Sequence, residues 1–222
     1  MSAFPSIPAA FERPRTGGID VLFVAGEHSG DQHAAKAIQD LLKHRPDLRV
    51  AAFGGPRMQA AGAQLLFDMT GFSAVGIVEV LSAYPCYRRL FARMTAWSLQ
   101  WKPKLVVLVD YPGLNLRLAN ELRLAGLSRA GGGETAVIQY VSPQLWAWKP
   151  KRRFTMARDL DAVGTIFPFE PAVYADTKLD ARFVGHPFAE ADHVPALSYD
   201  REGPVLLLPG SRPKPVRKIF PA

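Results

Sequence analysis

The sequence predicts an α/β fold built on a doubly wound parallel sheet. Short apolar runs alternate along the chain with segments of helical period. Several of these runs are apolar on both faces, which is typical of central strands in a parallel sheet. In chain order, the expected strands cover residues 19–25, 50–53, 105–109, 136–141, 162–167 and 182–184.

Three segments between these runs have the spacing of helices that lie on a sheet. After the first strand, Ala34, Ile38 and Leu41 recur every three or four residues, and Ser29 or Asp31 is positioned to cap the start of the helix. Further helices are expected over 85–101 and 115–126. The alternation of strand and helix favours parallel strands joined by helical crossovers.

The two ends of the chain differ from this central pattern. Residues 1–18 lack the apolar run of a signal peptide, and we expect them to form a flexible tail before a domain over 19–200. Residues 205–208 form another apolar run, followed by a tight turn. Because a lone strand cannot stabilise itself, we interpret 201–222 as the start of a second α/β domain that the chain does not complete.

Composition limits the classes of function. With 222 residues and 48% apolar side chains, the chain can bury a sizeable core. The single Cys86 forms no internal disulfide, and the five histidines lack metal-binding spacing, so we predict no metal. The net charge of +7 favours an anionic partner, which could be nucleic acid, a lipid surface or a phosphorylated substrate. No run is long enough to span a membrane, so we predict a cytoplasmic or peripheral protein.

Two turns follow expected strands at the sheet edge where α/β proteins bind ligands. The first, AGEHSGD, contains Glu27 and Ser29 and matches neither a dinucleotide fingerprint nor a nucleophile elbow. In the second, Asp110 could accept the proton of an attacking hydroxyl group. The alternatives are structural: Ser29 caps a helix, Glu27 is solvated, and Asp110 caps a turn together with Asn115.

A third segment, residues 140–153, combines tryptophans with cationic side chains. Such a composition is typical of a membrane interface and equally of a nucleic-acid stacking surface. Alternatively, the tryptophans belong to the core and the basic residues to a solvated helix start. The predicted interface residues are Trp146, Trp148, Lys149, Lys151, Arg152 and Arg153.

Eight blocks of the sequence, taken in order, resemble the lipid-A-disaccharide synthases. They are AGEHSGD (25–31), FGGPRMQAAG (53–62), VGIVEVL (75–81), DYPGLNLRLA (110–119), YVSPQLWAWKPKR (140–152), FPFEPAVY (167–174), RFVGHPFAEA (182–191) and LLPGSR (207–212). The resemblance implies a glycosyltransferase-B fold of two Rossmann-like domains, of which this chain has only begun the second.

The resemblance also implies a reaction and its residues. It implies inverting transfer of 2,3-diacylglucosamine from its UDP conjugate to 2,3-diacylglucosamine 1-phosphate, in a β-1,6 linkage and without a cofactor. In this interpretation Asp110 is the general base. The implied substrate-binding residues are Glu27, Ser29, Asp31, Asn115, Ser211 and Arg212, of which the last two lie near the substrate phosphates.

Because both of these substrates are lipids, the resemblance favours peripheral binding at the inner face of the inner membrane. Two alternatives stay open: another UDP-sugar glycosyltransferase or epimerase of the same architecture, and a non-catalytic lipid-binding fragment. Nucleic-acid binding rests only on the charge and the tryptophan-rich segment, and because no nucleic-acid-binding motif is present we predict no nucleic-acid partner.

Overall fold

The computed structural model describes residues 6–70, 77–187, 189, 200–205, 207 and 216–217, and in 77–85 it describes the backbone alone. Contacts within the chain divide it into two units, residues 1–187 and 188–222. We had expected this division near residue 200. All of the elements described below belong to the first unit. None of the helices in the described ranges is long and apolar enough to cross a membrane.

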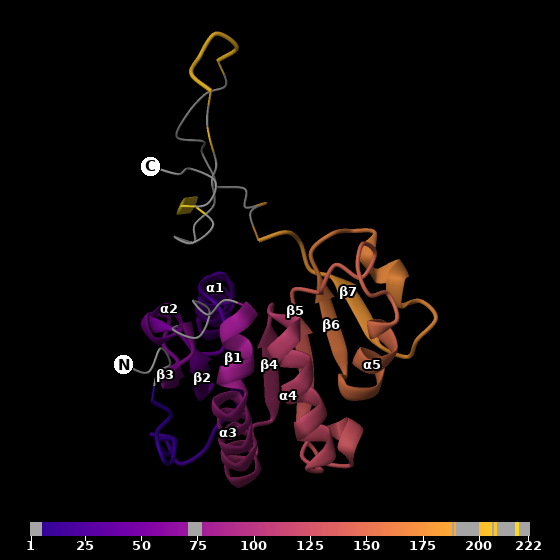
Figure 1. Ribbon diagram of the computed structural model, residues 1–222. Coiled ribbons are helices and arrows are strands. Elements are labelled where there is room, and N and C mark those ends of the chain that lie inside the picture. The colour runs from indigo at the N-terminus through magenta and orange to yellow at the C-terminus, as the bar shows by residue number, and fades with distance from the viewer. Residues whose placement is uncertain are drawn as a thin grey trace. The chain divides into compact units, whose positions relative to one another are not determined.

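The first unit is built on a seven-stranded sheet whose paired strands are all parallel (Figure 1). The strand order is β3-β2-β1-β4-β5-β6-β7. The strands are β1 (Val21–Ala25), β2 (Val50–Gly54), β3 (Gln64–Asp68), β4 (Leu105–Val109), β5 (Ala136–Tyr140), β6 (Ala162–Thr165) and β7 (Asp180–Phe183). This order is that of a Rossmann-like doubly wound sheet, so the predicted fold class is confirmed. The sequence patterns missed β3.

In the register of the sheet, the carboxyl ends of β1, β4 and β5 are aligned. Ala25 at the end of β1 pairs with Val109 of β4, which in turn pairs with Tyr140 of β5. The strand order reverses between β1 and β4, and ligands bind in the crevice outside the strand ends at such a switch point. The turns after these three strands therefore form the candidate site.

Helices cover both faces of the sheet. The helices α1 (His28–His44) and α2 (Pro56–Ala60) pack on one face, against residues such as Val21 and Phe23. The other face carries α3 (Ile77–Trp101), α4 (Pro112–Leu124) and α5 (Arg152–Asp159), and Figure 1 shows α3 and α4 in front of the strands. Side chains alternate along β1, so Leu22 and Val24 belong to this second core.

Several boundaries differ from those predicted from the sequence. The helix α3 begins at Ile77 rather than at residue 85, and α4 begins at Pro112 rather than at 115. Proline fits the first turn of a helix because the N–H that it lacks would have no helical partner there. The described residues also include the short 3-10 helices η2 (Arg129–Gly131) and η3 (Glu170–Tyr174).

Residues expected in a flexible tail are instead held against the core. The Phe11 ring lies 4.8 Å from that of Phe53, between centroids, and the Trp97 indole donates to the Glu12 carbonyl at 2.9 Å. The Arg15 N–H donates to the Gln64 side chain at the start of β3. The segment therefore covers part of the sheet, which its composition did not reveal.

The amino ends of the strands are joined by an ion-pair network around Asp20. Its carboxylate accepts hydrogen bonds from the guanidinium Nε of Arg49, before β2, at 2.8 Å and lies 2.9 Å from the Lys104 ammonium, before β4. The hydrogen bond from Arg49 holds the pKa of Asp20 well below its usual range, although burial opposes the shift. The network therefore joins β2, β1 and β4 at their amino ends.

Candidate active site

Asp110 lies directly after β4, at the switch point of the sheet. Its backbone N–H donates to the Tyr140 carbonyl at 2.9 Å, which continues the sheet pairing by one residue. The φ angles of Asp110 and Tyr111 are 50° and 37°. Few residues other than glycine adopt such values, which cost about 1–3 kcal/mol each and persist only where the surroundings enforce them.

Two buried amides hold this turn in place. The Asn115 amide nitrogen donates to the carbonyl oxygens of Val109 and Asp110 at 2.9 and 2.7 Å, and that of Gln139 donates to the Asp110 carbonyl at 2.9 Å. Gln139 also donates to the Val141 carbonyl at 3.2 Å. The Asp110 backbone is therefore fixed by side chains from α4 and β5, while its own side chain is half-buried at the edge.

The roles of these amides differ from those expected. We predicted Asn115 as a substrate-binding residue, but its side chain is fully buried and acts on the Asp110 backbone. Gln139 was not predicted at all. A signal was available, because Gln139 is the one strongly polar residue in the otherwise apolar run of β5. The side-chain oxygens of both amides are buried without a hydrogen-bond partner among the described residues.

The turn after β1 faces the Asp110 turn. A Cβ added to Gly26 would lie 2.6 Å from the Tyr111 ring, so only glycine permits this close approach. Glu27 is half-buried and Ser29 is exposed. Glu27 and Ser29 follow Ala25, the last residue of β1, by two and four residues, so both lie in or next to the turn at the switch point.

Asp31 faces away from the site. It is 1% exposed, and its carboxylate accepts hydrogen bonds from the backbone N–H groups of Gly55, Arg57 and Met58 at 3.0 to 3.1 Å. Instead of capping α1, it caps the start of α2. The N-cap residue of α1 is Glu27, and it makes no side-chain capping bond. We expected Asp31 to bind substrate, whereas the structure gives it an architectural position.

Three further titratable side chains, His33, His186 and Tyr87, interact with Asp110, with Tyr111 or with one another. Burial lowers the pKa of His33, the charge of Asp110 opposes that shift, and the charge of His186 adds to it. Burial also raises the pKa of Tyr87 to about 12, and a hydrogen bond with Tyr111 contributes. None of these three was among the predicted site residues. His33 could have been noticed because it follows Ser29 by one helical turn.

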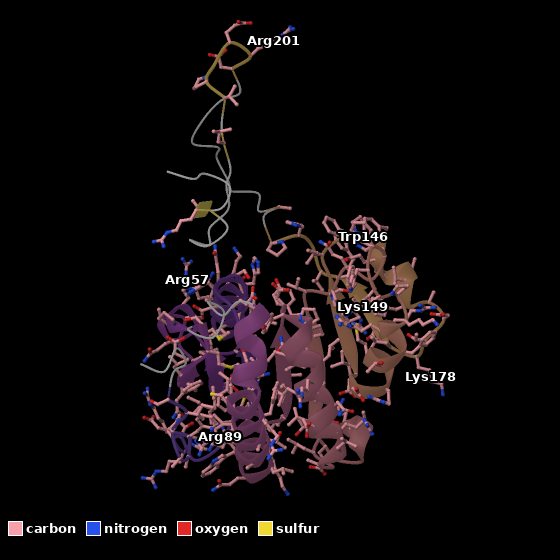
Figure 2. All side chains as sticks on the ribbon, in the orientation of Figure 1. Arg57, Arg89, Trp146, Lys149, Lys178 and Arg201 are labelled. Carbon is pink, nitrogen blue, oxygen red and sulfur yellow. The ribbon has the colours of Figure 1, made fainter. Side chains whose placement is uncertain are left out.

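The tryptophan-rich segment is anchored at its start and exposed beyond. The Ser142 hydroxyl lies 2.7 Å from the buried Tyr174 hydroxyl, whose pKa burial raises to about 12. Trp146 and Trp148 are 51% and 67% exposed, and Trp146 packs edge-on against Phe169. The tryptophans therefore do not belong to the core. Figure 2 shows Trp146 and Lys149 on the part of the unit that contains β6 and β7.

The four cationic residues of the segment fall into two groups. Arg153 forms an ion pair with Asp176 at 2.6 Å. Lys149, Lys151 and Arg152 form no ion pair with a carboxylate in the described ranges. These three line an open cavity of about 710 Å³, which the first turn of α4 lines from the other side. The cavity lining is Pro112, Gly113, Leu116, Arg117, Lys149, Pro150, Lys151, Arg152 and Thr155.

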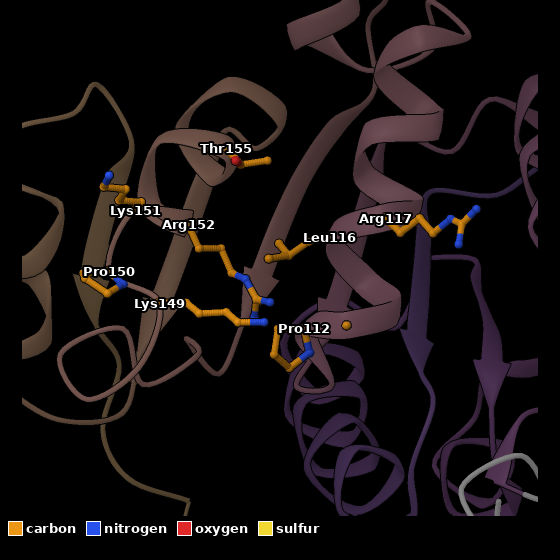
Figure 3. A pocket seen from close by; sticks show the side chains of 9 residues that line it. Pro112, Leu116, Arg117, Lys149, Pro150, Lys151, Arg152 and Thr155 are labelled. Carbon is orange, nitrogen blue, oxygen red and sulfur yellow. The ribbon is translucent and has the colours of Figure 1, made fainter. Parts of the chain in front are cut away.

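Side chains in this cavity point in different directions (Figure 3). Lys149 and Arg152 extend toward Pro112, at the start of α4. Arg117 extends away from this space, and its guanidinium lies 5.4 Å from the Phe91 ring centroid. Two cations are thus directed to one place beside the Asp110 turn.

The remaining predicted site residues, Ser211 and Arg212, lie outside the described residues. Among the described side chains, no group of three or more His, Cys, Asp or Glu is arranged to hold a metal ion.

Comparisons with known proteins match this chain over most of its length. The sequence model of the family "Lipid-A-disaccharide synthetase" matches residues 21–221. Lipid-A-disaccharide synthase 1 of Legionella pneumophila (strain Lens) is 36% identical over 211 residues, and the lipid-A-disaccharide synthase of Myxococcus xanthus is 38% identical over 210. Each match covers 90% of this chain and 53% of the relative, so the chain spans about half the length of the curated relatives it matches. The crystal structure of Acinetobacter baumannii MurG has a TM-score of 0.48 and 14% identity, and covers 78% of this chain and 47% of that one.

Proposed function

Because this chain belongs to the lipid-A-disaccharide synthetase family, we propose that it forms the acceptor-binding half of a lipid-A-disaccharide synthase. The observation that carries the proposal is the family match over residues 21–221, which includes the strained Asp110 turn at the switch point. The reaction is transfer of 2,3-diacylglucosamine from its UDP conjugate to the 6-hydroxyl of 2,3-diacylglucosamine 1-phosphate.

Asp110 acts as the general base in this proposal. The acceptor 6-hydroxyl attacks C1 of the donor sugar, the bond from C1 to the UDP oxygen breaks, and UDP leaves on the opposite face. Asp110 accepts the proton that the hydroxyl loses. The fixed backbone supports this role, because Asn115 and Gln139 restrict where the carboxylate can lie. Glu27 and Ser29, across the close contact at Gly26, are proposed to contact the acceptor.

Replacing the base tests the reaction. This chain is joined to the carboxyl-terminal half of the Myxococcus xanthus relative, and disaccharide formation is measured in mixed micelles with both lipid substrates. We expect transfer by the fusion and a loss of about 10²- to 10⁴-fold with Asp110→Asn. Binding of the acceptor should change little.

Asp47→Asn is the matched control, because Asp47 is an exposed carboxylate near the amino edge of the sheet. It should retain full transfer. Near-normal turnover by Asp110→Asn would remove Asp110 as the base. No transfer by a folded fusion that still binds UDP, beside an active Myxococcus enzyme, would contradict the proposed function.

We also propose a peripheral position on the cytoplasmic face of the inner membrane, because both proposed substrates are lipids. Exposed aromatic side chains support it: Trp146, Trp148, Phe154 and Phe169 are all at least half exposed. Such residues favour the headgroup region of a bilayer, and nearby cations favour an anionic leaflet.

Vesicle sedimentation tests this position. The chain should bind vesicles containing phosphatidylglycerol, and the Trp146→Ser/Trp148→Ser variant should lose most of that binding. Leu124→Ser removes a side chain that is 64% exposed at the far end of α4, and it should bind as the unmodified chain does. Equal binding by all three proteins would exclude the tryptophans as the membrane contact.

A further inference from the structure

The cavity between α4 and residues 149–155 has the features of an anion site. Lys149 and Arg152 extend into the same space without a carboxylate partner in the described part of the chain. Two cations directed at one place repel each other unless an anion lies between them. Arg49 and Arg123, by contrast, are basic side chains elsewhere in the unit that are paired with carboxylates.

The opposite wall of this cavity supplies a second attraction for anions. It is the first turn of α4, where the helix dipole is positive. Pro112 has no N–H, and the N–H groups of Leu114 and Asn115 donate to the Tyr111 carbonyl at 3.2 and 3.1 Å, so in this turn the Gly113 N–H is the donor without a backbone partner among the described residues. Gly113 lies in this turn, and a Cβ added to it would meet no described atom within 4 Å. The backbone is therefore open to a ligand at this point. Lys149 is itself held at a φ of 53°, an uncommon value for lysine.

We propose that this cavity binds a sugar phosphomonoester, and that Lys149 and Arg152 hold its phosphate against the start of α4. A phosphomonoester suits the site because it carries nearly two negative charges at neutral pH and several acceptor oxygens. The planar guanidinium of Arg152 can donate two parallel hydrogen bonds to it. The proposal rests on the proposed function and identifies the ligand as the 1-phosphate of the acceptor.

The position of the cavity fits that ligand. Asp110 precedes Pro112 by two residues, which span at most about 7 Å of chain. In a hexose 1-phosphate, the phosphate on C1 and the primary hydroxyl on C6 flank the ring oxygen, so a single sugar ring separates them. A phosphate in the cavity would thus leave the attacking hydroxyl close to Asp110. Recognition of the phosphate then orients the acceptor for attack.

Ligand binding to the 222-residue chain tests the proposal. Four probes are compared: 2,3-diacylglucosamine 1-phosphate in neutral micelles, the same lipid without phosphate, water-soluble glucosamine 1-phosphate, and phosphatidylglycerol vesicles. We expect the phosphorylated lipid to bind more tightly than the unphosphorylated one. The Lys149→Gln/Arg152→Gln variant should lose that preference, with a fall of about 10- to 100-fold for the phosphorylated lipid alone.

The matched control is Lys151→Gln/Arg117→Gln, which removes two cations from the same lining. Arg117 points away from the space that Lys149 and Arg152 share, and Lys151 is not directed at Pro112 (Figure 3). This control should keep the preference for phosphate. Unchanged binding of the unphosphorylated lipid by the first variant would show that the variant is folded.

Each other outcome overturns a defined part of the proposal. Equal affinity for the two lipids, or equal losses in the two double variants, would remove the phosphate site and leave the proposed function standing. Binding of glucosamine 1-phosphate through Lys149 and Arg152, without binding of either acylated sugar, would keep the site and contradict the proposed function. Dependence of vesicle binding alone on this pair would identify a phospholipid headgroup as the ligand instead.

Discussion

The two ends of the strands, here called the amino edge and the carboxyl edge of the sheet, are built differently. At the amino edge, carboxylates have partners: Asp20 forms ion pairs with Arg49 and Lys104, and Asp161 accepts a hydrogen bond from the backbone N–H of Val137 at 2.7 Å. At the carboxyl edge, cations point into a cavity, backbone angles are strained, and amide oxygens are buried without described partners. The amino edge is held together by ion pairs and hydrogen bonds, whereas the carboxyl edge carries two cations without a described carboxylate partner and two strained residues, Asp110 and Tyr111, in one turn.

The two ends of the strands therefore have different roles: one end stabilises the fold and the other carries the candidate site. The amino ends of the strands are joined by ion pairs and hydrogen bonds, while the turn after β4 has unfavourable backbone angles. Strain and unsatisfied groups lower stability, so they persist where function requires them. We therefore expect substitutions at the amino edge to change the free energy of unfolding, and substitutions at the carboxyl edge to change binding and transfer.

The largest effect on stability is expected at Asp20. Asp20→Asn removes the charge that Arg49 and Lys104 share, and should lower the free energy of unfolding by about 1.5–3 kcal/mol, because a buried carboxylate loses its charge-assisted hydrogen bonds while both cations are partly exposed. Urea unfolding at pH 7 measures it. Asp47→Asn, which breaks an exposed pair with Arg45, should cause no measurable change.

The same residue predicts an acid dependence of stability. The pKa of Asp20 is lower in the folded than in the unfolded chain, so its contribution is present above about pH 4 and is lost as the pH falls below that value. Between pH 5 and pH 3 the unmodified chain should lose more unfolding free energy than Asp20→Asn does. Parallel loss in both proteins would mean that other carboxylates dominate.

At the carboxyl edge, a substitution of Gln139 should change transfer more than it changes stability. Gln139→Met keeps the side-chain volume but removes the donor to the Asp110 and Val141 carbonyls. Stability should change by less than about 1 kcal/mol, because the unpartnered amide oxygen is removed as well. Transfer by the fusion should fall about 10- to 30-fold, since the Asp110 turn is held less firmly. A loss of stability without a loss of transfer would break the contrast between the edges.

A smaller effect is expected from relaxing backbone strain. Val141, after β5, has a φ of 68°, which is unfavourable for a β-branched residue. Val141→Gly should raise the free energy of unfolding by about 0.5–1 kcal/mol and weaken acceptor binding about threefold, because the turn is less pre-organised. Lys102→Gly relaxes a φ of 43° at the amino edge and is the matched control. It should leave acceptor binding unchanged.

Most of the sheet could be predicted from the sequence because central parallel strands are apolar on both faces. The edge strand β3 was missed because its apolar stretch is only three residues long, between Gln64 and Asp68. The helix α2 was missed because five residues are too few to show a helical period. The packing of Phe11 on Phe53 was missed for a different reason. It depends on a tertiary contact that no local pattern in residues 1–18 encodes.

The candidate site was only partly predictable. Position after a strand was enough to place Asp110 at the switch point, because the carboxyl ends of parallel strands meet at one edge. It could not separate residues that face the crevice from those that support it, and Asp31 and Asn115 proved to be buried. Composition likewise grouped Arg153 with Lys149 and Arg152, although an ion pair with Asp176 distinguishes it. Such distinctions depend on side-chain direction, which spacing does not specify.

The smallest expected effect concerns His33. Its pKa is lowered in the folded chain, mainly by burial, while Asp110 opposes the shift and His186 adds to it. The unfolded chain therefore binds a proton more readily below about pH 6.5, and the stability present above that value is lost as the pH falls. His33→Gln should lose less unfolding free energy between pH 7 and pH 5 than the unmodified chain, by well under about 1.4 kcal/mol.

The exposed His44, at the end of α1, provides the control, and His44→Gln should follow the unmodified chain. An equal pH slope in all three proteins would show that His33 does not titrate differently in the folded state. A neutral His33 matters for the proposed chemistry because a cation fixed beside Asp110 would stabilise the carboxylate and weaken it as a proton acceptor. The carboxyl edge would then hold its base without a fixed cation, beside a proposed phosphate site whose Lys149 and Arg152 have no carboxylate partner among the described residues.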